Sequence, residues 1–354
     1  MAEDVWVPID RLRRFGAGLL TALGVPEEDA ALVVETLIEA DLRGVESHGL
    51  AHLVEFYVRR IQAGHLNPRP AMRVVREGPA FAVLDADRGF GFVAAHRAID
   101  LAMEKAEGAG VAFVVVQRST HYGAGFHYAL KAARRGFVGL SVTTGGNIVV
   151  PPGGRRRAYG SNVIAAAAPT GKGWEFVLDG ATSVVAGGKY EIARRRGTRV
   201  DPAWGITEDG EPFDDPELFF AGRGAILPLG GRPETGAYKG FGYGILADVL
   251  SGVLSATGAS ALLPRTGAAA HCLAAVHIES FLPKEEFLRQ MDAFIDRLKE
   301  TDRLPGVAEI TIPGEPEARL ERERRARGEV PLHPSILEGF RAAAEELGVP
   351  YDLP

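Results

Sequence analysis

The sequence contains only one cysteine, Cys272, so an intrachain disulfide is excluded. Because Cys272 lies in an apolar run, we interpret it as a buried structural thiol rather than a nucleophile. Lysine is scarce, with seven residues, and the 46 acidic side chains outnumber the 40 basic ones. A net charge of −6 without an extended basic face argues against nucleic acid as a partner.

Long apolar runs are missing as well. No stretch of roughly 18 residues is free of polar side chains, so we expect no membrane span. The stretch from Met1 to Trp6 is acidic and lacks the basic and apolar regions of a signal peptide, which predicts a cytoplasmic location. Because 46% of the 354 residues are apolar, the chain can build a large core, which we expect to be divided among two or three lobes.

Hydrophobic periodicity predicts an α/β protein that begins with helices over residues 10–23, 27–42 and 47–64. Alternating segments over 72–76 and 80–85 predict a β-hairpin. The other expected strands cover residues 111–116, 137–143, 163–168, 175–179, 271–279 and 309–312. The other expected helices cover residues 93–107, 241–254, 284–300 and 335–347. The highly charged segment 315–329 is assigned to neither class.

Residues 43–49, with the sequence RGVESHG, place His48 at the start of the predicted helix 47–64, with Ser47 as its N-cap. The apolar stripe of this helix consists of Leu50, Leu53, Val54, Tyr57 and Ile61. The opposite, polar face carries His48, His52, Glu55 and Arg59. The positive end of the helix dipole disfavours the imidazolium, so we expect His48 to be neutral near pH 7.

The segment from Gly89 to Ala94 matches the dinucleotide-binding pattern G-x-G-x-x-A between a predicted strand and a predicted helix. The next strand, however, ends in Gln117 and Arg118 rather than in an acidic residue that would hold the ribose hydroxyls, although Arg118 could face a 2′-phosphate. The rest of the chain also lacks regular alternation of strands and helices. We therefore reject an orthodox Rossmann fold.

Further segments match one protein family in the same order along the chain. They are Ser119 to Ala124, Pro151 to Gly154, Tyr159 to Asn162, Asp179 to Ser183, Gly188-Lys189, Leu227 to Gly231, Tyr238 to Gly242, and Ile312 to Glu315. With these motifs the chain resembles the type-2 malate/L-lactate dehydrogenase family. That family includes sulfolactate, ureidoglycolate and diketogulonate dehydrogenases and cyclic-imine reductases, and the resemblance covers essentially the whole length.

The resemblance implies a non-Rossmann α/β fold, in which a largely antiparallel central sheet binds the nicotinamide cofactor beside a helical lobe formed by both chain ends. It suggests a helical lobe of residues 1–70 completed by 316–354, an α/β sheet layer of 71–120 with 260–315, and an NAD(P)-binding domain of 121–259. Relatives are typically homodimers with the site near the subunit interface.

The resemblance also assigns roles in hydride transfer between NAD or NADP and a small 2-hydroxy or 2-oxo acid. His48 matches the proton donor or acceptor, Ser47 lies beside it, and His121 matches a second active-site histidine. Arg43 and His52 are expected substrate contacts. The expected cofactor contacts are Asp179, Gly180, Ala181, Thr182, Ser183, Lys239, Gly240, Gly314 and Glu315. Hydride transfer to a 2-oxo carbon requires a proton at the oxygen, which histidine can supply near neutral pH. No metal is implied.

Relatives usually carry an arginine four residues beyond the donor histidine, where this chain has His52. A neutral imidazole binds a carboxylate less strongly and less directionally than a guanidinium does. The substrate therefore stays open between a 2-hydroxy acid of the malate or lactate type, a cyclic imine, and a substrate of the ureidoglycolate or diketogulonate type. Two other classes are a metal-dependent hydrolase, because His48 and His52 at i, i+4 could chelate a metal, and a non-catalytic nucleotide-binding protein.

Overall fold

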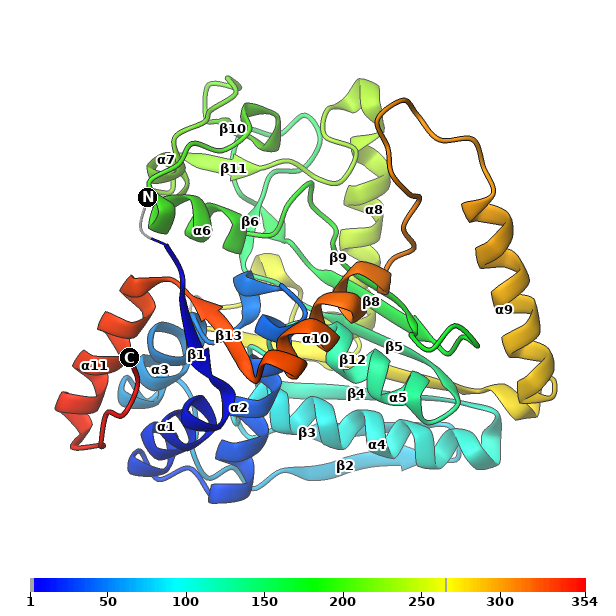
Figure 1. Cartoon of the computed structure of the whole chain (residues 1–354), viewed down its shortest axis with the longest axis horizontal. Helices are drawn as coiled ribbons and strands as arrows, with labels where there is room; N and C mark the ends of the chain where they lie inside the picture. The colour runs from blue at the N-terminus through cyan, green and yellow to red at the C-terminus, as the bar shows by residue number, and fades with distance from the viewer. Residues whose placement is uncertain (1–2, 265) are drawn as a thin grey trace.

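A computed structural model describes residues 3–264 and 266–354 (Figure 1). Residues 1, 2 and 265, which fall in the predicted helical lobe and sheet layer, lie outside the described residues. Over the described ranges, the largest sheet has seven strands in the order β2-β3-β4-β12-β5-β8-β9. They are β2 (Arg73–Gly78), β3 (Phe81–Asp85), β4 (Val111–Thr120), β5 (Phe137–Thr143), β8 (Val163–Ala168), β9 (Phe176–Ala181) and β12 (Ala268–His277). Neighbouring strands are antiparallel except for β3 and β4, which are parallel.

Helices cover both faces of this sheet, and the strand residues alternate accordingly. On one face, Val114 and Val116 of β4 join the core beneath α4 (Gly91–Ala109), and α5 (Phe126–Arg134) packs on β5 and β8. On the other face, Val115 packs with Cys272 and with α8 (Ala237–Asp248). Burial raises the pKa of the Cys272 thiol to about 12, and the expectation of a buried thiol is confirmed.

The two ends of the chain pack into one core. Strand β1 (Val5–Pro8) pairs antiparallel with β13 (Glu329–Leu332). Figure 1 shows α1 (Ile9–Ala22) beside the C-terminal helix α11 (Pro334–Leu347), and α2 (Glu27–Leu42) packs against α1. Leu12, Leu37, Leu53 and Phe340 belong to this core cluster. The helix α2 also contacts α4, so it joins the core of the chain ends to the sheet.

The remaining elements lie around these two cores. A smaller sheet has the order β10-β11-β6-β7, and α6, α7, α9 and α10 complete the longer helices. Their bounds are β6 (Asn147–Val149), β7 (Tyr159–Gly160), β10 (Gly205–Thr207), β11 (Gly224–Ile226), α6 (Gly188–Arg196), α7 (Pro216–Phe220), α9 (Lys284–Lys299) and α10 (Glu315–Arg327). Single 3₁₀ turns occur at Pro202–Trp204, Pro233–Thr235, Ser260–Leu262 and Ile278–Ser280, and α8 continues as a π-helical segment over Val249–Val253. Among the helices described, none is both long and apolar enough to cross a membrane.

The predicted continuous helix over 47–64 is wrong. The segment is a 3₁₀ turn (Glu46–His48), a π-helical segment (Leu53–Val58) and the short helix α3 (Arg59–Gln62). Gly49 between them is extended, and its Cα faces the carboxylate of Asp41 so closely that a Cβ would lie 2.1 Å from Oδ1. Asp41 accepts a 2.8 Å hydrogen bond from the Leu50 N–H. The expected N-cap at Ser47 is wrong, because Ser47 lies inside the 3₁₀ turn.

The C-terminal charged segment also differs from expectation. The expected strand over 309–312 is wrong, because those residues have no regular structure, whereas 315–327 form α10. Gly314 and Gly328, with φ of +95° and +74°, bound this helix. Its buried side includes Glu321, which pairs with Arg43 at 2.7 Å. A charged residue on the buried face hides the helical periodicity from sequence analysis.

The glycines of the segment 89–94 serve packing. A Cβ on Gly91 would lie 2.2 Å from the carbonyl oxygen of Thr120 at the end of β4. The Gly91 N–H donates a 3.2 Å hydrogen bond to Thr120 Oγ1. This backbone N–H at the start of α4 is therefore already bound to a side chain rather than free for a phosphate. Arg118 is paired with Asp85 at 3.0 Å and Asp87 at 2.7 Å rather than free for a phosphate.

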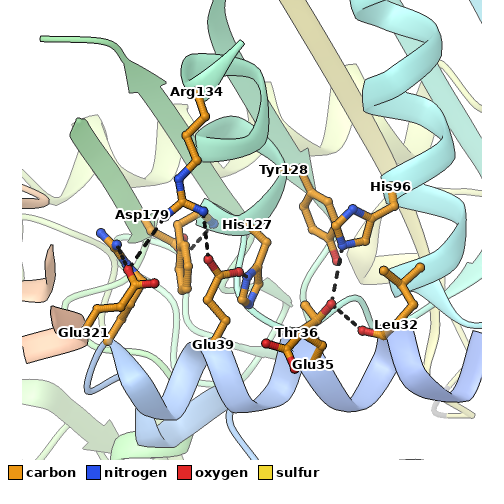
Figure 2. A network of polar contacts seen from close by, with 12 residues as sticks. Leu32, Glu35, Thr36, Glu39, His96, His127, Tyr128, Arg134, Asp179 and Glu321 are labelled. Carbon is orange, nitrogen blue, oxygen red and sulfur yellow. Dashed lines mark hydrogen bonds and ion pairs between the residues drawn. The ribbon is translucent and has the colours of Figure 1, made fainter. Parts of the chain in front are cut away.

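A polar network joins α2 to α5 and α10 (Figure 2). Glu39 on α2 contacts His127 Nδ1 at 2.6 Å and accepts a 3.3 Å hydrogen bond from Arg134, both on α5. Arg134 also lies 3.7 Å from Glu321 on α10. Burial alone would raise the pKa of Glu39, but His127 and Arg134 outweigh it and hold the pKa at about 2. The network therefore fixes α2, which leads directly into residues 43–49.

Candidate active site

Three histidines from separate places in the sequence converge at the end of α2. His48 belongs to the 3₁₀ turn, His52 precedes the π-helical segment, and His121 follows β4. The ring centroids lie 5.7 Å apart for His48 and His121, 5.8 Å for His48 and His52, and 5.9 Å for His52 and His121. His52, which we predicted on the polar face of a helix, is only 5% exposed.

His48 and His121 are held differently. Ser47 Oγ lies 2.9 Å from His48 Nδ1. The Nδ1 atom of His121 lies 2.7 Å from the Tyr57 hydroxyl and accepts a 3.3 Å hydrogen bond from the Gly123 N–H. Because a backbone N–H can only donate, Nδ1 of a neutral His121 is the acceptor and its ring proton lies on Nε2.

The electrostatic environment keeps both rings neutral. Burial, reinforced by His52, lowers the pKa of His48 to about 4, and burial also lowers the pKa of His121 well below its usual value. We predicted a neutral His48 from a helix dipole, but the physical cause is desolvation. A neutral imidazole that is partly removed from water can take a proton in one direction of a reaction and return it in the other.

Glu191 of α6, which no sequence motif indicated, forms a hydrogen bond with His52. Its Oε2 lies 2.9 Å from His52 Nε2, and the His52 ring stacks on Phe56 with centroids 4.1 Å apart. Burial would raise the pKa of Glu191, but the hydrogen bond and charge of His52 lower it below its usual value. His52 is thus bound to an anion within the protein.

Two cavities adjoin the histidines. The first, which we name the Asp179 cavity, has a volume of about 260 Å³ and is lined by Ser47, His48, Asp179, Ala181 and Gly314 among others. The second, the Arg60 cavity, has a volume of about 330 Å³ and is lined by His121, Phe56, Arg60 and Asn147 among others. Because the rings of His48 and His121 stack, the histidine cluster lies between the two cavities.

Asp179 is one of two acidic residues in the described lining of its cavity, the other being Glu317. Its Oδ2 accepts a 3.0 Å hydrogen bond from the Phe126 N–H, and burial raises its pKa to about 6. The lining also contains Gly123 and Gly125, and the lack of a side chain on Gly125 leaves room near the carboxylate. A Cβ on Gly125 would lie 3.2 Å from Asp179 Oδ1.

Other expected cofactor contacts are distributed unevenly. Gly180, Thr182 and Ser183 adjoin the cavity residues Asp179 and Ala181, but the two hydroxyls are already used as donors. Thr182 Oγ1 donates to the Ser161 carbonyl at 3.2 Å, and Ser183 Oγ donates to the Val185 carbonyl at 2.7 Å.

Three further expected cofactor contacts, Lys239, Gly240 and Glu315, do not line the Asp179 cavity. The carboxylate of Glu315 is paired with Lys299 at 2.6 Å and accepts from the Ile312 N–H at 3.2 Å. Lys239 is exposed on α8, and Gly240 is buried, where a Cβ would lie 2.3 Å from the Leu229 carbonyl oxygen.

Arg43 lines the Asp179 cavity, but its guanidinium forms an ion pair with Glu321. The residue is 3% exposed, its Nη1 lies 2.7 Å from Glu321, and its guanidinium lies 5.1 Å from the Phe126 ring centroid. In the described part of the chain, no group of three or more His, Cys, Asp or Glu side chains is arranged to hold a metal ion.

Comparison with known proteins agrees with this geometry. Residues 7–341 match the family model for malate/L-lactate dehydrogenase. A malate dehydrogenase of Pyrococcus abyssi is 42% identical over 98% of this chain and 96% of its own length, and an L-sulfolactate dehydrogenase of Methanocaldococcus jannaschii is 32% identical over 94% of both. The solved structure of malate dehydrogenase from Pyrococcus horikoshii matches with a TM-score of 0.90 at 39% identity over 99% of both chains. The chain therefore belongs to the malate/L-lactate dehydrogenase family, a family of NAD(P)-dependent oxidoreductases that act on 2-hydroxy acids.

Proposed function

We propose that this protein transfers a hydride between NAD or NADP and C2 of a small 2-hydroxy or 2-oxo acid of the malate or lactate type. The observation that carries the proposal is that His48, partly buried and held neutral, lines the same cavity as Asp179 and Gly314. An acid–base group and three of the expected cofactor contacts, Asp179, Ala181 and Gly314, thus line one cavity, as a hydride-transfer site requires.

In this proposal the two histidines have different roles. When bound, the nicotinamide supplies or accepts the hydride. With its Nδ1–H donating to Ser47 Oγ, neutral His48 keeps the Nε2 lone pair for the hydroxyl proton of the 2-hydroxy acid. His121 offers Nε2–H to the same oxygen and stabilises the negative charge that develops there.

The residues of the Asp179 cavity fit a nicotinamide nucleotide. Asp179 offers acceptors to hydroxyl or amide groups, and Gly123, Gly125 and Gly314 let a ligand approach the backbone. In this interpretation β9 of a largely antiparallel, non-Rossmann sheet supports the cofactor, and the helical lobe formed by both chain ends supplies His48. The roles of Gly180, Ala181, Thr182, Ser183, Lys239, Gly240 and Glu315 stay predictions of the same kind. The choice between NAD and NADP stays open. Arg118, the residue that could have faced the 2′-phosphate of NADP, is paired with the carboxylates of Asp85 and Asp87 instead.

The proposed division into units keeps the boundaries 1–70 with 316–354, 71–120 with 260–315, and 121–259. In this division the second and third units share one sheet, because β12 lies between β4 and β5. The shared sheet would hold these two units rigidly together.

We also propose a homodimer, formed through an apolar face of α8 and its π-helical extension. Leu246, Val249 and Val253 follow one another at helical spacing and are 47%, 46% and 57% exposed. Lys239, at the start of the same helix, would then lie near the subunit interface. The mass of the native protein from light scattering should be that of a dimer, and Leu246→Glu should shift it to the monomer. A monomeric wild-type protein would contradict this arrangement.

A substrate panel tests the proposed reaction. Oxidation of NADH and of NADPH would be followed with pyruvate, oxaloacetate, a sulfonated 2-oxo acid, a ureido-substituted 2-oxo acid and a cyclic imine. We expect turnover with at least one 2-oxo acid. Turnover of the imine alone would favour a cyclic-imine reductase. NADH binding without any turnover would instead support the nucleotide-binding alternative, and a stoichiometric metal after dialysis would revive the metal-dependent hydrolase.

A further inference from the structure

We propose that Arg60 binds the substrate carboxylate, and that the Arg60 cavity holds the body of the 2-oxo acid. This inference rests on the proposed function, which it deepens by naming the anion-binding group. It also accounts for His52 at the position where relatives carry an arginine.

Arg60 is directed toward the histidine cluster. It belongs to α3, and its guanidinium carbon lies 4.6 Å from the centroid of the Phe56 ring. That ring lies 5.6 Å from the ring of His121, and all three residues line the same cavity. On the other side, Gly267 makes room for the guanidinium, because a Cβ there would lie 2.5 Å from Arg60 Nη1. An aromatic ring and a glycine therefore hold the guanidinium in place at the cavity.

The charge of Arg60 is not compensated within the described residues, where it forms no ion pair and no side-chain hydrogen bond. Its neighbour Arg59 behaves differently, contacting Glu346 at 2.6 Å and Gln62 at 2.8 Å. Burial lowers the pKa of Arg60, which indicates that the guanidinium is partly removed from water. A desolvated cation without a partner is costly, and an anionic ligand would remove that cost.

The described lining of the cavity strengthens this argument. It contains the two arginines Arg60 and Arg157 and no acidic residue. Asn147 contributes a buried Oδ1 without a hydrogen-bond partner, which would suit the hydroxyl of a 2-hydroxy acid. The cavity volume of about 330 Å³ suits a small acid.

His52 cannot take the same role, because Glu191 lies 2.9 Å from its Nε2 and would repel an incoming carboxylate. Arg60 can instead bind the carboxylate through two parallel N–H donors. A substrate fixed in this way would direct its 2-oxygen toward the Nε2–H of His121.

The test compares Arg60→Met with the matched control Arg59→Met. For the 2-oxo acid that the wild type reduces best, we expect kcat/KM of Arg60→Met to fall on the order of 100-fold, mainly through KM. The affinity for NADH should not change in either variant, and Arg59→Met should keep wild-type constants. Wild-type KM in Arg60→Met would overturn the proposal.

Binding of oxamate, an amide isostere of a 2-oxo acid, separates this inference from the proposed reaction. Calorimetry with the NADH-loaded protein should give binding to the wild type and to Arg59→Met, and strongly weakened binding to Arg60→Met. If the wild type reduces no 2-oxo acid but binds oxamate through Arg60, the proposed function fails and the carboxylate site stands. If oxamate binds wild type and Arg60→Met equally, or neither, the carboxylate site is wrong. Should Arg60→Met fail to fold, Arg60→Lys keeps the charge without the bidentate geometry and should weaken oxamate binding, whereas unchanged affinity would overturn the proposal.

Discussion

Replacing His48 by alanine should lower kcat by about 100-fold to 10,000-fold, the range that a positioned general acid or base contributes. The reason is that hydride transfer to a 2-oxo carbon leaves an oxygen that needs a proton, and the His48 imidazole, which lines the same cavity as Asp179, can exchange it. The measurement is kcat at saturating cofactor and substrate. Because Asp179 and the glycine wall are unchanged, NADH affinity should stay near that of the wild type.

His277, at the end of β12, provides a control, because it lines neither of the two cavities. Its Nδ1 lies 2.9 Å from Ser280 Oγ. His277→Ala should retain the wild-type kcat. If His48→Ala also retained it, the assigned role would be wrong, and His121→Ala would be the next variant. A loss in His48→Ala that appeared only in KM would point to substrate binding rather than proton transfer.

Glu39→Gln should lower the free energy of unfolding by about 3 kcal/mol at pH 7. The pKa of Glu39 falls from 4.5 to about 2 in the folded protein, because His127 and Arg134 outweigh the effect of burial. Each pKa unit corresponds to about 1.36 kcal/mol of differential stabilisation. Glutamine keeps the shape of the side chain but lacks its charge, so urea unfolding of the two proteins isolates this contribution.

The stabilisation by Glu39 should depend on pH in a defined direction. A carboxylate with a lowered folded-state pKa stabilises the protein above its unfolded pKa, here 4.5, and loses that stabilisation as pH falls toward 2. The difference between wild type and Glu39→Gln should therefore shrink through this window. Glu35→Gln on the same helix is the control, because Glu35 pairs with the exposed Arg13 and should contribute about 1 kcal/mol or less. A difference that does not change with pH would contradict the assignment.

Most regular elements follow from local patterns. The helices expected over 10–23, 27–42, 93–107 and 284–300 correspond to α1, α2, α4 and α9 within a few residues. Apolar spacing along the chain is sufficient there, because one face of each element is buried and the other is solvated. Helix α10 escaped this reasoning because Glu321 on its buried side is neutralised by Arg43, 278 residues away in the sequence.

The candidate site was predictable to a similar extent. Family motifs pointed to His48, Asp179 and Gly314, which line one cavity although they are distant in sequence. They also pointed to Lys239 and Glu315, which do not line that cavity, and to His52 as a substrate contact. Glu191 and Arg60 belong to none of these motifs. Their importance depends on which charges lie near them in space, a property that sequence spacing does not report.

The sequence by itself determined the composition of the core, the α/β class, the family and the identity of its candidate acid–base histidines. These properties depend on residue type and on neighbours within a few positions. Only the tertiary structure decided that desolvation rather than a helix dipole keeps His48 neutral, that Glu191 occupies His52, and that Arg60 faces a cavity without an acidic residue in its described lining. The physical reason is that burial and electrostatic interaction act through space, between residues that only folding brings together.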